Sequence, residues 1–269
     1  MKTVAVECHP TAVIHEGARL AEGVRIGPYC VVGERVSIGR DTVVEANAVI
    51  TGYTTMGERN RIFSFASIGF EPQDLKFRGE VSTLEIGDDN IFREFVTIHR
   101  GTALGGGRTL IGNGNLFMNY THIAHDCIVG NSIIFANAAT LAGHVTIEDH
   151  ARIGAYSGVH QFCRVGIDAF IGGYTVATKD VLPFSKTVGN RARLYGVNTI
   201  GLERRGFSRE RIEAIRAAFR VLQHPCLNVS QAVSELSADL SNPDVTTIVE
   251  FIRSSKRGVV VKRGKEEND

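Results

Sequence analysis

The chain has 269 residues, of which 43% are hydrophobic, and a formal net charge of +1 at pH 7. This length allows a large buried core, and the near-neutral charge argues against a general nucleic-acid-binding protein. The N-terminus lacks an apolar signal core and no stretch reaches membrane-spanning length, so we expect no integral membrane segment. Five cysteines without a CxxC pair predict reduced thiols and a cytoplasmic location.

An aliphatic residue or methionine recurs at every sixth position over residues 14–68. A second run over residues 111–171, shifted by one residue, also admits phenylalanine. An ordinary β-sandwich would not hold one spacing over so many repeats, whereas short fixed periods are typical of parallel β-helices. Three hexads should close one coil of about 18 residues. Glycine often follows the inward residue, as at Gly33 and Gly39, and we expect it to supply positive φ at the corners.

The period is interrupted at three places. A polar excursion at residues 70–84 is interpreted as a functional loop. Residues 101–109 contain three consecutive glycines, but no Gly-Lys-Ser/Thr follows, so a register-changing loop is favoured over a phosphate-binding one. The repeat ends near Pro183. We therefore expect a mainly β domain, a β-helix, over residues 1–190 and a C-terminal α-helical domain over residues 191–269.

The C-terminal segment predicts three amphipathic helices, with start signals at Ser208 and at Asn242-Pro243. Its charged tail, residues 254–269, is expected to fray. Apolar residues at helical spacing define the inward faces. They are Ile212, Ile215, Phe219 and Leu222 for the first helix, Val229, Ala232, Val233, Leu236 and Leu240 for the second, and Val245, Ile248, Val249 and Ile252 for the third.

Residues 18 apart should stack on the same corner of successive coils. His125, Gly143 and Gln161 form one such column, and Asp126 and His144 belong to the column beside it. Imidazole titrates near neutral pH and suits general acid–base chemistry, which an adjacent carboxylate supports. A glycine N–H without side-chain obstruction is suited to stabilise a developing oxyanion. These columns therefore predict a catalytic edge, near which His99, His122 and His160 also fall.

Two competing chemistries use the same residues. His122, His125 and His144 could ligate zinc, as three histidines do in the gamma-class carbonic anhydrases. The histidines are accompanied by Gln161, Asp74, Lys76 and an arginine pair, Arg204 and Arg205. This set favours recognition of a polar, anionic substrate instead. Cys127 and Cys163 lie near the histidines, but small buried core residues are favoured over a cysteine nucleophile.

Several longer segments match one family in order and spacing over nearly the whole chain. These segments are ASIGFEPQDLKF (66–77), VTIHRGT (96–102), THIAHDCIVGN (121–131), ATLAGHV (139–145), VHQFCRVG (159–166) and GVN with GLERRGFS (196–208). With them the chain resembles the acyl-[acyl-carrier-protein]–UDP-N-acetylglucosamine O-acyltransferases of lipid A biosynthesis. The resemblance implies that the β-helix is left-handed.

The resemblance also implies an activity and roles for residues. A homotrimer without metal or organic cofactor would transfer a 3-hydroxyacyl chain from acyl carrier protein to the 3-hydroxyl of UDP-N-acetylglucosamine. His125 would be the general base, Asp126 its support and Gly143 the oxyanion donor. Asn198 and the arginines would bind the nucleotide, and Gly173 would leave space for a longer acyl chain. The implied substrate-binding residues are Gln73, Asp74, Lys76, His99, His122, His144, His160, Gln161, Gly173, Asn198, Arg204 and Arg205.

One departure from the family pattern bears on the acceptor. Well-known members carry an acidic residue two places after the matched asparagine, and here that position is Ile200. A related N-acyltransferase acting on a 3-amino sugar is therefore an alternative. The lipid A relative of that kind has an extra N-terminal uridine-binding domain. Because the repeat here begins by about residue 8, we expect the chain not to be that relative. A metal-dependent hydratase and a non-enzymatic scaffold are the remaining alternatives.

Overall fold

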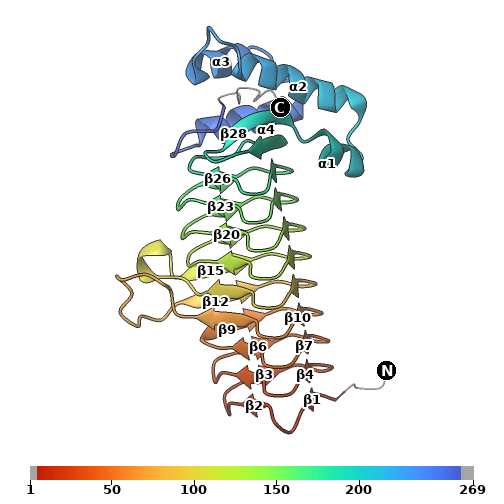
Figure 1. Cartoon of the computed structure of the whole chain (residues 1–269), viewed down its shortest axis with the longest axis vertical. Helices are drawn as coiled ribbons and strands as arrows, with labels where there is room; N and C mark the ends of the chain where they lie inside the picture. Colours follow the sequence, from red (N-terminus) through yellow and green to blue (C-terminus); the bar gives the residue numbers. More distant parts are fainter. Residues whose placement is uncertain (1–4, 262–269) are drawn as a thin grey trace.

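The computed structural model describes residues 5–261, which form a tall column of short parallel strands with helices at its C-terminal end (Figure 1). The chain winds through three sheets in turn, so every third strand joins the same sheet. We call the 11-stranded sheet A, the 9-stranded sheet B and the 8-stranded sheet C. Sheets A and B, B and C, and C and A meet at the three corners of each coil. This is the parallel β-helix that the six-residue period predicts.

The strands of each sheet follow one another in chain order and pair in parallel, except that the last two strands of sheet A pair antiparallel. Sheet A contains β1 (Glu7–Cys8), β4 (Arg25–Ile26), β7 (Val43–Val44), β10 (Arg61–Ile62), β13 (Ile91–Phe92), β16 (Leu116–Phe117), β19 (Ile134–Phe135), β22 (Arg152–Ile153), β25 (Phe170–Ile171), β27 (Ser185–Val188) and β28 (Arg193–Val197). Sheet B contains β2 (Val13–Ile14), β5 (Val31–Val32), β8 (Val49–Ile50), β11 (Ser67–Phe70), β14 (Thr97–His99), β17 (His122–Ile123), β20 (Thr140–Leu141), β23 (Gly158–Val159) and β26 (Val176–Ala177). Sheet C contains β3 (Arg19–Leu20), β6 (Ser37–Ile38), β9 (Tyr53–Met56), β12 (Thr83–Ile86), β15 (Arg108–Ile111), β18 (Ile128–Val129), β21 (Thr146–Ile147) and β24 (Arg164–Val165).

The core is the stack of inward residues that the period identifies. Strand pairing joins residues 18 apart, as in Ile26 with Val44, which confirms the predicted coil length. Phe92, Phe117 and Phe135 are fully buried and stack along the axis, with ring centroids 4.9 and 5.1 Å apart. Each coil thus buries its apolar residues only by stacking on its neighbours.

Both internal interruptions leave the column at the corner between sheets B and C. Met56 pairs with Ile86, 30 positions on instead of 18, so this coil carries an extra 12 residues, or two hexads. Ile86 pairs with Ile111, 25 positions on, so the next coil carries seven extra residues, one more than a hexad. These lengths explain why the first loop preserves the phase and the second shifts it. The loops project from the same side of the column (Figure 1).

The expectation that glycines after the inward residues supply positive φ is confirmed at Gly69, with φ 83°, but is wrong at the other positions. Gly33 and Gly39 lack positive φ, and the left-handed corner positions belong to other residues, such as Asp41 with φ 56° and Tyr174 with φ 54°. The glycines serve close packing instead. A Cβ on Gly39 would overlap the Gly57 carbonyl of the next coil. Side chains are excluded there because successive coils nearly touch.

As far as residue 261, the C-terminal end contains four α-helices, one more than predicted: α1 (Thr199–Arg204), α2 (Arg209–Leu222), α3 (Val229–Leu236) and α4 (Pro243–Arg253). The short α1 was missed, although Asn198 caps it. The capping side chains of Ser208 and Asn242 lie where predicted. The prediction that Leu240 belongs to the second helix is wrong, because α3 ends at Leu236 and Leu240 is exposed. The helices within residues 5–261 are too short or too polar to cross a membrane.

The prediction that the tail frays is wrong for its first part. Val259 and Val260 are each only 7% exposed. The Asp180 N–H donates to the Gly258 carbonyl at 2.9 Å, and the Val260 N–H donates to the Asp180 carbonyl at 2.8 Å. Residues 254–261 therefore bind back onto the last coil because two valines find an apolar surface there. Residues 262–269 lie outside the described part of the chain.

Candidate active site

Four of the predicted site residues meet at the corner between sheets B and C. His125 and Asp126 follow β17, and Gly143 and His144 follow β20, one coil further on. The two coils are in direct contact, since the His144 N–H donates to the His125 carbonyl at 3.0 Å. Asp126 and His144 occupy left-handed corner positions, with φ 60° and 63°. The His144 ring also stacks on Phe162 of the following coil, with centroids 4.4 Å apart.

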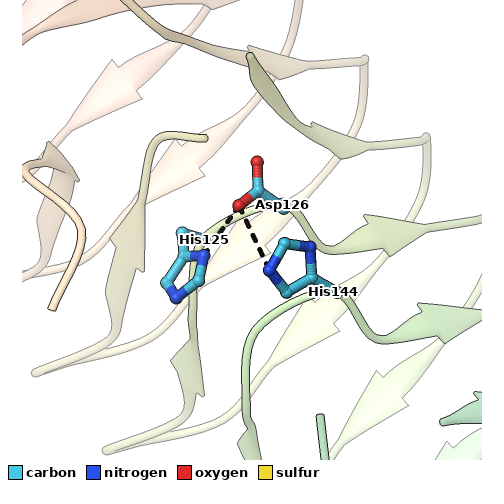
Figure 2. Close-up of side chains that lie close together, drawn as sticks. All are labelled: His125, Asp126 and His144. Carbon is cyan, nitrogen blue, oxygen red and sulfur yellow. Dashed lines mark hydrogen bonds and ion pairs between the residues drawn. The ribbon is translucent and has the colours of Figure 1, made fainter. Parts of the chain in front are cut away.

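His125 and Asp126 form a hydrogen-bonded dyad, shown in Figure 2. His125 Nδ1 lies 2.7 Å from Asp126 Oδ2, and the Asp126 side chain is fully buried. Thr102 donates its N–H to Oδ1 at 2.8 Å and its hydroxyl to Oδ2 at 2.7 Å. Burial alone would raise the pKa of Asp126, but hydrogen bonds from His125 and Thr102 outweigh it and lower this pKa below its ordinary value. The carboxylate is therefore ionised at neutral pH.

This geometry prepares His125 to accept a proton. An ionised carboxylate can only accept hydrogen bonds, so Asp126 selects the tautomer with the proton on Nδ1 and leaves the Nε2 lone pair free. The His125 side chain is 13% exposed, so the ring borders solvent. His144 Nε2 lies 3.7 Å from the same oxygen (Figure 2). Burial lowers the pKa of His144, while Asp126 opposes that change.

Two glycines leave room for the dyad. A Cβ on Gly143 would lie 2.6 Å from Cε1 of the His125 ring, and a Cβ on Gly105 would overlap the Asp126 carboxylate. The Gly143 N–H has no hydrogen-bond acceptor within residues 5–261. Side chains are thus excluded on both sides of the dyad, and one backbone donor beside His125 is available to a ligand.

His99, at the end of β14, extends the site by one coil on the N-terminal side, and His122 lies on β17 in the same coil as His125. The rings of His99 and His122 meet edge to face with centroids 5.0 Å apart, and His122 Nδ1 lies 2.7 Å from the Thr97 hydroxyl. The pKa of His99 is lowered to about 4, mainly by burial and to a smaller extent by the neighbouring His122 and His125. Burial also lowers the pKa of His122. His99 is therefore neutral at pH 7, and its buried Nδ1 has no partner among the described residues.

The long polar loop faces the same corner. Its Asp74 carboxylate opposes the lowering of the His144 pKa, so the two side chains lie close enough to interact electrostatically. The Lys76 N–H donates to Asp74 Oδ1 at 2.9 Å, which folds the loop into a tight turn. Gln73 lines a pocket of about 660 Å³ together with His99. The loop therefore supplies polar groups on the N-terminal side of the dyad.

His160 and Gln161 lie one coil beyond Gly143, at the exposed end of the same corner. His160 Nδ1 is 3.2 Å from the Gln161 carbonyl and 3.2 Å from an Arg257 Nη group. The docked tail thus reaches this edge of the site.

The remaining predicted residues lie elsewhere on the chain. Asn198, Arg204 and Arg205 line a cavity of about 890 Å³ on the outer face of sheet A. Gly173 is exposed at the corner between sheets A and B, where a Cβ would lie 3.4 Å from the Ala155 carbonyl. A single chain therefore does not bring these four residues to the dyad.

The competing chemistries fit this geometry less well. Ligand atoms of His125, Asp126 and His144 lie within 4.8 Å of one another, which is close enough for a metal ion. However, the Asp126 oxygens already accept three hydrogen bonds from Thr102 and His125 at 2.7–2.8 Å, so the carboxylate is committed as a histidine partner.

The cysteine alternative fails on the protonation of the thiols. Burial raises the pKa of Cys127 to about 12 and also raises that of Cys163, so neither thiol provides a thiolate nucleophile at neutral pH.

Sequence reasoning missed the residues that support the dyad. Thr102 holds the carboxylate, and the Thr109 hydroxyl accepts the Asp126 N–H at 2.9 Å. Both lie within the second interruption of the period, for which the sequence predicts only a change of register. The sequence held one indication of their role, because this loop leaves the column at the corner that carries the histidines.

Comparisons with known proteins agree on one family. A model described as "Udp N-acetylglucosamine O-acyltransferase; Domain 2" matches residues 180–260, and the six-repeat bacterial transferase hexapeptide model matches residues 17–52. The chain is 51% identical to the acyl-[acyl-carrier-protein]–UDP-N-acetylglucosamine O-acyltransferase of Myxococcus xanthus and 46% identical to that of Thermodesulfovibrio yellowstonii. Each match covers 94% of this chain and 98% of the relative.

Solved structures give the same result. The LpxA structure from Acinetobacter baumannii superposes with a TM-score of 0.91 at 42% identity, covering 94% of this chain and 99% of that one. The UDP-N-acetylglucosamine acyltransferase of Francisella novicida gives 0.92 at 40% identity, covering 96% and 95%. The fold is thus the left-handed β-helix of these enzymes. The chain belongs to the acyl-[acyl-carrier-protein]–UDP-N-acetylglucosamine O-acyltransferase family.

Proposed function

We propose that this protein transfers a 3-hydroxyacyl chain from acyl carrier protein to the 3-hydroxyl of UDP-N-acetylglucosamine, the first step of lipid A biosynthesis. The names of its relatives support the substrates. The single observation that carries the chemistry is the His125–Asp126 dyad with its 2.7 Å hydrogen bond beside an unobstructed Gly143 N–H.

His125 acts as the general base. Its Nε2 takes the proton from the sugar 3-hydroxyl as the oxygen attacks the thioester carbonyl carbon, and Asp126 stabilises the imidazolium that forms. The Gly143 N–H donates to the oxyanion of the tetrahedral intermediate. The C–S bond then breaks, and His125 returns the proton to the departing thiolate of the carrier protein. The products are an ester and a free thiol, so neither metal nor organic cofactor is required.

The surrounding polar residues bind the two substrates. A neutral His99 accepts or donates a hydrogen bond without placing a charge beside the base, which its lowered pKa supports. His122, His144 and Lys76 complete the walls near the dyad. We assign the same role to Gln73, Asp74, His160 and Gln161, which border this corner.

The active form is a homotrimer in which each site is shared between neighbouring subunits. The supporting observation is spatial. The dyad lies at the corner between sheets B and C, whereas Asn198, Arg204 and Arg205 line a cavity on sheet A of the same chain. If a neighbour's sheet A faces this corner, its arginines bind the diphosphate of the sugar nucleotide that reaches His125.

The three buried cysteines, which form no disulfide, support a cytoplasmic location for the protein.

An acyl-transfer assay tests the proposal. Purified protein is supplied with UDP-N-acetylglucosamine, or its 3-amino analogue, and with 3-hydroxyacyl carrier proteins of several chain lengths. We expect an alkali-labile ester of UDP-N-acetylglucosamine, formed at the same rate in the presence of a chelator, and a preference for longer chains because Gly173 leaves space. Exclusive formation of an amide on the 3-amino sugar would contradict the O-acyltransferase assignment, and preference for the shortest chain would contradict the role of Gly173.

A further inference from the structure

The cavity on sheet A is strongly cationic. It lies between the outer face of the column and α1, with a volume of about 890 Å³. Asp168 is the only acid among the described residues that line it, and α1 contributes the apolar Ile200 to the wall. The cations are His150 when protonated and, at all physiological pH values, Arg152, Lys186, Arg204, Arg205 and Arg216.

Asp168 holds one of these cations in an unusual way. It is 3% exposed, and its Oδ1 accepts a hydrogen bond from Arg205 Nε at 3.0 Å. Within residues 5–261, neither Nη group of Arg205 has a hydrogen-bond partner, and Asp168 Oδ2 is buried without a donor. The backbone carbonyl of Asp168 also accepts a hydrogen bond from Asn198 Nδ2 at 2.9 Å. One corner residue therefore contacts two of the three residues proposed to bind the nucleotide.

Attachment through Nε has a chemical consequence. A guanidinium held at Nε keeps its two Nη groups available, and a pair of such donors matches two oxygens of a phosphate. A buried carboxylate also restricts the rotamers of Arg205, so less side-chain entropy is lost when a phosphate binds. Because arginines and a lysine far outnumber the single acid, the cavity stays attractive to a dianion.

We infer that Asp168 is a positioning residue of the nucleotide pocket, holding Arg205 through Nε so that its Nη groups bind the diphosphate of a nucleoside diphosphate sugar. The inference rests on the proposed function. It gives the pocket a carboxylate from the column itself, whereas the α1 residues that line the cavity include no acid.

Binding measurements with UDP and with uridine test this role. We expect Asp168→Asn to weaken UDP binding about tenfold and to leave uridine binding unchanged, because uridine lacks the phosphates. In an Arg205→Ala background, Asp168→Asn should cause no further loss, since Asp168 acts through Arg205. In the transfer assay, the same variant should raise KM for UDP-N-acetylglucosamine and leave kcat within about twofold.

The matched control is Asp89→Asn. Asp89 has the same left-handed corner conformation, φ 58°, and accepts a hydrogen bond from Arg59 Nε at 2.8 Å, but it lies outside the cavity. Asparagine tolerates this backbone conformation, so both variants should fold. Arg205→Lys changes the other partner of this contact, whose side chain is partly exposed. It should weaken UDP binding as Asp168→Asn does, because lysine has no fork of donors.

Three outcomes would overturn the inference: unchanged UDP affinity in Asp168→Asn, equal losses for UDP and uridine, or losses that add to those of Arg205→Ala. Each is read against a wild-type protein that binds UDP and transfers acyl chains. A wild-type protein that does neither would contradict the proposed function instead, so the two failures are distinguishable.

Discussion

His125 Nδ1 lies 2.7 Å from Asp126 Oδ2, although the two residues are adjacent in the chain. Their proximity depends on the corner, where Asp126 takes φ 60° and the Thr102 loop donates two hydrogen bonds to its carboxylate. A regular strand would direct successive side chains to opposite faces. The β-helix corner is thus the feature that turns two neighbouring residues into a base and its partner.

Asp126→Asn should reduce kcat by about 10²-fold or more, because an amide NH₂ facing Nδ1 favours the tautomer with its proton on Nε2, which cannot act as a base. Asparagine tolerates the left-handed conformation, so the thermal midpoint should change little. Steady-state transfer kinetics measure the effect. Asp41→Asn, at another left-handed corner with φ 56°, is the control and should retain wild-type kcat. Equal rates in the two variants would contradict the dyad.

Gly143→Ala should lower activity, because its Cβ would lie 2.6 Å from the His125 ring and must displace it. A shift of about 1 Å in a catalytic group costs on the order of 10²-fold in rate. Gly158→Ala is the matched control, since a Cβ there meets no heavy atom within 4 Å. The two variants should denature at similar urea concentrations but differ in kcat. Full activity of Gly143→Ala would show that neither the ring position nor the open N–H matters.

The stability of the protein should fall as the pH drops from about 6.5 to 4, partly because of His99. Burial lowers the pKa of His99 to about 4 in the folded state, whereas the unfolded chain takes up this proton near pH 6.5. The unfolded state therefore binds more protons in this window, which costs the folded state about 1–3 kcal/mol. Urea unfolding of wild type and His99→Gln at pH 7.5 and 4.5 measures the difference. His99→Gln should lose less stability on acidification than exposed His9→Gln, and an equal loss would argue against the buried neutral imidazole.

The docked tail should contribute to the stability of the last coil. Asp180 is 1% exposed and accepts the Arg164 N–H at 2.8 Å and the Ser255 hydroxyl at 2.6 Å. Asp180→Ala leaves both donors without this partner and should lower the free energy of unfolding by about 2–3 kcal/mol. Denaturant titration provides the measurement, with exposed Asp239→Ala as control. Similar midpoints for the two variants would mean that the tail does not stabilise the column.

The sequence predicted the column because burial in a β-helix repeats with the coil. The same 18-residue spacing predicted that His125 and Gly143 lie together, since residues one coil apart must stack. It did not predict Thr102 as a partner of Asp126, because that contact spans a loop whose path depends on tertiary packing. The role of glycine was mistaken at Gly39, where contact between coils, rather than backbone φ, excludes a side chain.

The general-base role of His125 is tested most directly by the acyl-transfer rate of His125→Ala, compared with that of His9→Ala, which changes an exposed histidine on the first coil. Loss of the general base should reduce kcat by about 10²–10⁴-fold or more while the protein stays folded by circular dichroism and still binds UDP. His9→Ala should keep the wild-type rate. A His125→Ala variant that transfers 3-hydroxyacyl chains to UDP-N-acetylglucosamine at the wild-type rate would contradict the role of His125 as general base.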